Sequence, residues 1–226
     1  MASGNHGELQ RIIAVQARLN GTVALLIGLA ATLVTLLPVL WEISQHVNTM
    51  AHEGGHALMG ALVGHRVMSV RMEANGDGVT LTRGRAGLGS VVTGFVGYPA
   101  PGLLGLGAAK LIAMGHIVAV LWLLALALAV LLLVARGWFA VTCVLCAGFL
   151  LYLTLRYASL GTQVTVAYGT TWFLLISGFA VVVSHGVNAG DAANLKSRTR
   201  LPAGLWAGLW FLGSVCTLVL GAKLLL

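Results

Sequence analysis

The stretch TMAHEGGHALMG, residues Thr49 to Gly60, holds two histidines and a glutamate in close succession. It lies in an apolar segment that follows the long apolar run from Gly21 to Trp41. About 20 predominantly apolar residues suffice for a helix to cross a bilayer, so this run predicts a membrane-spanning helix. Ionisable side chains are costly in the bilayer core and mark functional sites there. The stretch therefore combines a membrane fold with a candidate site.

The composition extends this interpretation to the whole chain of 226 residues. Hydrophobic residues make up 58% of the sequence, charged residues only 8%, and the mean hydropathy is +0.95. A soluble domain averages about 25% charged residues, so this chain has too little charge to cover a water-exposed surface. Its apolar runs are continuous rather than alternating, which argues against a transmembrane β-barrel. The sequence predicts an all-α polytopic membrane protein with a single membrane domain.

Six or seven transmembrane segments are predicted, and the third of them is interrupted. Their approximate ranges are 21–41, 43–64, 88–112, 116–135, 137–155, 166–189 and 203–224. The third contains GYPAPG, residues Gly97 to Gly102, where two closely spaced prolines predict a kink or break. We interpret residues 1–20 as a cytoplasmic N-terminal tail before an uncleaved first helix. Residues 21–226 then form one membrane-embedded domain.

The positive charges predict an orientation in the membrane. If the N-terminus is cytoplasmic and seven segments alternate, the positive residues that fall outside are Lys110, Arg156 and Lys223. Those that fall inside are Arg11, Arg18, Arg66, Arg71, Arg83, Arg85, Arg136, Lys196, Arg198 and Arg200. This bias follows the positive-inside rule. The net charge of +7 thus serves orientation, and we expect no nucleic-acid partner because no aromatic residues are interleaved with the basic ones.

Residues 66–85 form the longest polar stretch between segments. Apolar and polar residues alternate there on both sides of Asn75-Gly76-Asp77-Gly78. Alternation around a glycine-rich turn predicts a β-hairpin directly after the second segment. The alternative is a plain basic loop.

The acidic residues single out two candidate functional positions. The chain has six of them, and only Glu53 and Asp191 fall at or near membrane depth. A carboxylate in that environment must be paired or neutralised, so both are functional hypotheses.

Residues His52 to His56 match the pattern H-E-x-x-H. On a helix, residues four apart are separated by about 40° and about 6 Å, so both imidazoles can reach one metal ion. Glu53 lies beside that face and can take a proton from a metal-bound water, as in zinc metalloproteases. The alternative is a polar network in which histidine and glutamate hold neighbouring helices together.

These residues resemble the site-2 protease family of intramembrane zinc metallopeptidases, and most closely its short bacterial branch without a PDZ domain. The similar stretches are HEGGHALMGALVG, GYPAPGLLGLGAA and GDAANL, between about Trp41 and Trp210. The resemblance implies one zinc ion held by His52, His56 and an aspartate from a later segment, for which Asp191 is the candidate. The alternative is that Asp191 only stabilises the end of a helix.

Two further residues and one departure belong to this comparison. His185 is a weaker candidate ligand, and Asn188 matches an asparagine that in the family hydrogen-bonds the scissile carbonyl. Here Asp191 is followed by Ala192 rather than the family's glycine, and no proline precedes it nearby.

The resemblance implies an enzyme in the bacterial cell membrane that hydrolyses peptide bonds in or near transmembrane segments of membrane-tethered proteins. Its partners are then a substrate helix and the lipid bilayer, with Glu53 as the catalytic base. The hairpin at 66–85 would add a strand to an unwound substrate. The alternative is a non-catalytic zinc-binding scaffold, a pseudoprotease. No oligomeric state is indicated.

Overall fold

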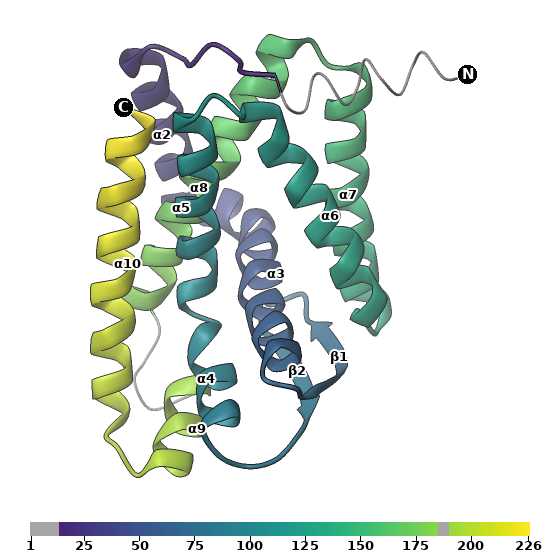
Figure 1. Cartoon of the computed structure of the whole chain (residues 1–226), viewed down its shortest axis with the longest axis vertical. Coiled ribbons are helices and arrows are strands. Elements are labelled where there is room, and N and C mark those ends of the chain that lie inside the picture. Colours follow the sequence, from purple (N-terminus) through teal and green to yellow (C-terminus); the bar gives the residue numbers. More distant parts are fainter. Residues whose placement is uncertain (1–13, 185–189) are drawn as a thin grey trace.

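The computed structural model describes residues 14–184 and 190–226, and shows a bundle of helices with a small sheet at one end (Figure 1). The helices are α2 Gly21–Leu36, α3 Pro38–Leu62, α4 Leu88–Val96, α5 Pro99–Ala113, α6 Ile117–Val134, α7 Trp138–Tyr157, α8 Leu160–Ser184, α9 Gly190–Thr199 and α10 Ala203–Leu225. The strands are β1 Arg66–Met72 and β2 Gly78–Arg83. The predicted all-α membrane fold with a hairpin after the second segment is confirmed.

Within the described residues, α6, α7, α8 and α10 are long and apolar enough to cross a membrane. Two further pairs of helices are strongly bent, α2 with α3 by 100° and α4 with α5 by 67°. Counting each pair as one span gives up to six spans, the lower of the two predicted numbers. The break between α4 and α5 lies at the GYPAPG stretch, as the prolines predicted.

Residues 14–20, the first that the structure describes, and the hairpin lie at opposite ends of the bundle, whereas the predicted topology put both on one side (Figure 1). The Arg18 guanidinium donates a hydrogen bond of 2.7 Å to the carbonyl of Leu224, near the C-terminus. At the other end, the backbone of Val70 in β1 accepts a hydrogen bond from Arg136, between α6 and α7. Because α2 and α3 form one bent pair instead of two antiparallel spans, the chain traverses the bundle once between residue 20 and the hairpin.

The core of the bundle lies where α5, α8 and α10 pack together with α2. The side chains of Ile112, Tyr168 and Leu175 are fully buried there. A side chain at Gly178 of α8 would lie 3.0 Å from the backbone nitrogen of Gly102 in α5. Small residues thus let these helices approach closely, which is how helices gain packing energy in lipid.

The hairpin is antiparallel and rests on α3. Val70 pairs with Thr80, and Gly76 in the turn adopts a φ of +93° that favours glycine. The hydroxyl of Thr49 in α3 donates a hydrogen bond of 2.8 Å to the carbonyl of Gly76. The turn of the hairpin is therefore attached to the helix that carries the HEGGH motif.

Candidate metal centre

Helix α3 carries the motif, buries two of its residues and packs closely on its neighbours. Glu53 and His56 are 4% and 7% exposed. A side chain at Gly55 would collide with Ala100 near the start of α5, whereas one at Gly54 would meet open space. The second glycine of the motif therefore brings α3 and α5 together.

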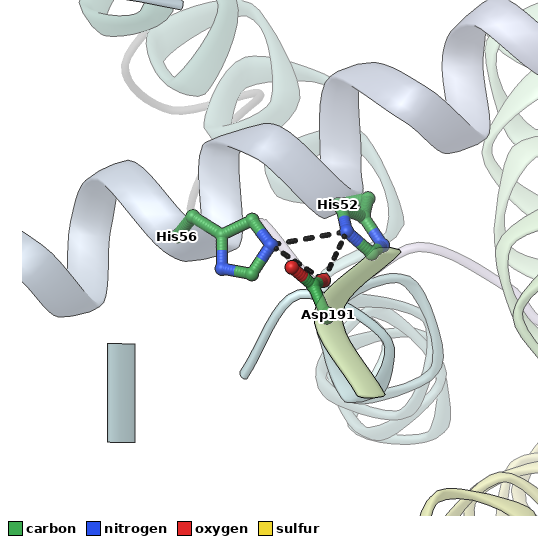
Figure 2. Close-up of side chains that lie close together, drawn as sticks. All are labelled: His52, His56 and Asp191. Carbon is green, nitrogen blue, oxygen red and sulfur yellow. Dashed lines mark hydrogen bonds and ion pairs between the residues drawn. The ribbon is translucent and has the colours of Figure 1, made fainter. Parts of the chain in front are cut away.

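Three side chains from two distant parts of the chain, α3 and α9, meet beside α3 (Figure 2). His52 Nε2 and His56 Nε2 each lie 3.0 Å from Asp191 Oδ2. The two histidine nitrogens are also 3.0 Å apart. The structure thus brings together the three residues that the sequence and the resemblance singled out, and within the described residues they form a group able to hold a metal ion.

The carbonyl of Thr93 fixes the orientation of the His56 ring. His56 Nδ1 lies 2.6 Å from this oxygen and can donate its proton to it. Thr93 belongs to the last turn of α4, and a carbonyl oxygen has two lone pairs, so it can accept this bond in addition to a helical one. A proton on Nδ1 leaves Nε2, the atom that faces Asp191, with a free lone pair for a metal.

The break between α4 and α5 is stabilised by Trp210 of α10. Pro99 has no N–H to donate to the carbonyl of Phe95 four residues earlier, so the break leaves this group without a helical partner. The indole nitrogen of Trp210 donates a hydrogen bond of 2.9 Å to it. Trp210 also stacks on Tyr98, whose ring packs edge-on against His52. A contact chain therefore runs from α10 to the metal centre.

Asp191 enters the site from the first turn of α9, a short helix anchored by the buried side chains of Ala192 and Leu195. The N-terminus of a helix stabilises a negatively charged carboxylate at this position. Asp191 can therefore stabilise the start of α9 and contribute to the site at the same time. Burial alone would raise the pKa of Asp191, but hydrogen bonds and charge from His52 and His56 outweigh burial and lower this pKa well below its usual range.

The residues present fit a zinc ion. Two imidazole nitrogens and a carboxylate oxygen form a common catalytic donor set, with a position left for water. Ligands of tetrahedral zinc at about 2.0–2.1 Å are about 3.3 Å apart, close to the 3.0 Å observed. Gly97 provides the space, because a Cβ there would lie 2.6 Å from His52 Nε2 and 2.5 Å from His56 Cε1.

A cavity of about 650 Å³ opens beside this group. It is bounded by one face of α3, by β2, by Tyr98 and by α9. Glu53 also lines the cavity, and its carboxylate accepts a hydrogen bond of 2.6 Å from the hydroxyl of Thr80 in β2. The cavity is therefore the place where a substrate can meet both the candidate ligands and Glu53.

Sequence reasoning missed Thr80, Thr93 and Gly97, because their roles depend on contacts between elements. A partial signal existed for Gly97, which opens the stretch GYPAPG where the helix had to break. His185 and Asn188 lie outside the described residues, so their predicted roles stay predictions.

A family model described as Peptidase M50B-like matches residues 25–221. The chain belongs to this family. The match confirms the resemblance to site-2 proteases and makes this M50B-like chain a multi-pass integral membrane protein of an intramembrane metallopeptidase family. No curated protein and no solved structure matches the chain.

Proposed function

We propose that this M50B-like protein is an intramembrane zinc metallopeptidase that hydrolyses peptide bonds in or near transmembrane segments of membrane-tethered proteins. The observation that carries the proposal is the meeting of His52 Nε2, His56 Nε2 and Asp191 Oδ2 at mutual distances of 3.0 Å. A polar network that only joins helices needs no such convergence of three metal-binding atoms beside a glycine. The bilayer and a substrate helix are the partners that this activity implies.

Each residue of the site has its own role in the proposed reaction. His52 and His56 would hold one zinc ion through Nε2, and Asp191 through Oδ2. Bound zinc would polarise the scissile carbonyl and lower the pKa of its water to about 7. The Glu53 carboxylate takes the proton of the attacking water and passes it to the leaving amine. The buried position of Glu53 keeps this carboxylate out of bulk water.

The shape of the cavity favours an extended peptide. One wall is β2, which pairs with β1 along one edge and has no second strand partner within the described residues. An extended segment can bind such an edge through main-chain hydrogen bonds. A transmembrane substrate would therefore have to unwind locally before its peptide bond reaches the site.

The proposal is tested by measuring zinc per chain and cleavage together. The purified wild type is compared with Asp191→Ala, Glu53→Gln and, as a control, Glu73→Gln, an exposed residue directly after β1. A fluorogenic peptide with one transmembrane segment, reconstituted in liposomes, serves as the substrate probe. We expect one zinc in the wild type and in both glutamine variants, and a strong loss of zinc in Asp191→Ala. Cleavage should fall at least about a hundredfold in Glu53→Gln and be unchanged in Glu73→Gln.

The same measurements separate the alternatives. A wild type that binds no zinc after resupply would contradict the metal centre and leave the three side chains as a helix-packing network. A zinc-loaded wild type that cleaves none of a panel of such peptides would favour the non-catalytic scaffold.

A further inference from the structure

The carboxylate of Glu53 lies beside β2, which donates a hydrogen bond to one of its oxygens and has a glycine next to the other. Thr80 Oγ1 lies 2.6 Å from Glu53 Oε2 and 3.1 Å from the carbonyl oxygen of Glu53. On the other side, a Cβ built at Gly78 would lie 2.6 Å from Glu53 Oε1. The strand therefore holds one oxygen through a hydroxyl, and any side chain at residue 78 would collide with the other oxygen.

The hydrogen bond from Thr80 is of the strong kind. Hydroxyl groups that donate to carboxylates typically lie at about 2.5–2.7 Å, and the observed 2.6 Å falls in this range. A hydroxyl has a single proton, so the shorter contact, to Oε2, receives it.

The position of Thr80 is itself fixed by the rest of the hairpin. Thr80 pairs with Val70 of β1, which is 1% exposed. The backbone of Val70 in turn accepts a hydrogen bond of 2.8 Å from Arg136, in the connection between α6 and α7. The hydroxyl is thus held by a sheet that is anchored on two sides, to α3 and to the α6–α7 connection.

We propose that Thr80 is a positioning residue for Glu53, and that the hairpin is therefore a part of the catalytic site as well as a wall of the cavity. The inference rests on the proposed peptidase function. A glutamate side chain has three rotatable torsions, and a catalytic base must be held close to its productive geometry. Because Thr80 takes one of the lone pairs of Oε2, Oε1 beside Gly78 is the oxygen that this arrangement favours as the proton acceptor.

The test compares Thr80→Val, Thr80→Ser and Thr165→Val, using the fluorogenic transmembrane peptide in liposomes. Valine keeps the shape of threonine and removes the hydroxyl, whereas serine keeps the hydroxyl. Thr165 in α8 is exposed, donates its hydroxyl to the carbonyl of Gly161 in its own helix and does not line the cavity, so Thr165→Val is the matched control. For each variant we would measure kcat, KM, zinc per chain and the thermal unfolding midpoint.

We expect Thr80→Val to lower kcat tenfold or more, with KM within twofold and one zinc retained. Thr80→Ser should restore most of kcat, and Thr165→Val should match the wild type. A purely structural role would instead lower zinc content and the unfolding midpoint along with activity. The proposal is overturned if Thr80→Val keeps the wild-type kcat, if Thr80→Ser does not restore kcat, or if the whole loss of activity appears as a higher KM.

A failure of the proposed function gives a different result. A zinc-loaded wild type without activity overturns the peptidase assignment and, with it, any positioning role. An active wild type accompanied by a fully active Thr80→Val overturns the positioning role alone.

Discussion

A side chain at Gly97 would stand where the three candidate ligands meet. The Cβ of an alanine there would lie 2.6 Å from His52 Nε2 and 2.5 Å from His56 Cε1, well inside van der Waals contact. The backbone of Gly97 is right-handed helical, so alanine introduces no conformational strain. We expect Gly97→Ala to weaken zinc binding at least about tenfold, as disturbed ligand orientation does in other sites. Zinc titration of the metal-free protein measures this.

The matched control for this substitution is Gly107→Ala in the neighbouring helix α5. A Cβ at Gly107 meets nothing within 4 Å. This variant should bind zinc like the wild type. Wild-type affinity in Gly97→Ala would show that the metal lies elsewhere than between His52, His56 and Asp191.

At the residue scale, the sequence predicted what local spacing encodes. Two histidines four apart share one face of any helix, so their meeting in space follows from helix geometry alone. Asp191 is 135 residues from His56, and no spacing rule connects them; it was proposed through the family resemblance. The contacts of Thr80 and Gly97 come from the packing of β2 and α4 on α3, which local patterns do not specify.

At the scale of elements, the break between α4 and α5 depends on a hydrogen bond from another helix. We expect Trp210→Phe to lower the free energy of unfolding by about 1–2 kcal/mol, because the Phe95 carbonyl then loses its donor in a water-poor environment. Thermal unfolding in detergent measures the change.

The chain offers a close control in Trp206, which also packs its ring against Phe95. Its indole nitrogen is buried and has no hydrogen-bond partner within the described residues. Trp206→Phe therefore removes no hydrogen bond and should leave stability nearly unchanged. Equal losses in both variants would show that ring packing, and not the hydrogen bond, supports the break.

Local sequence patterns predict the breaks and turns between elements, but not the angle at which two helices meet. Two prolines within GYPAPG predicted the break, because each removes a backbone donor, and alternation around Asn75 to Gly78 predicted the hairpin. The 100° bend between α2 and α3 was not predicted. Pro38 at the start of α3 signals a new helix, but the angle between two apolar helices is set by tertiary packing.

At the scale of the whole molecule, the hairpin and α9 lie at one end of the bundle (Figure 1), and the elements at this end carry most of the positive residues of the described chain. Those on the hairpin, on α9 and in the connections at this end are Arg66, Arg71, Arg83, Arg85, Arg136, Lys196, Arg198 and Arg200. At the opposite end, with the N-terminal residues that the structure describes, lie Arg18, Lys110, Arg156 and Lys223. The charge bias now favours the hairpin end, and not the N-terminus, as the cytoplasmic side.

This orientation would place the metal centre near the cytoplasmic surface, and single cysteines can test it. In a variant without Cys143, Cys146 and Cys216, we would introduce Asn75→Cys in the hairpin turn or Ser159→Cys between α7 and α8. A membrane-impermeant maleimide added to intact cells should label Ser159→Cys at once and Asn75→Cys only after permeabilisation. The positive-inside rule gives this result because the cytoplasmic side retains the excess of lysine and arginine. The reverse pattern would place the N-terminus in the cytoplasm and open the site to the outer side.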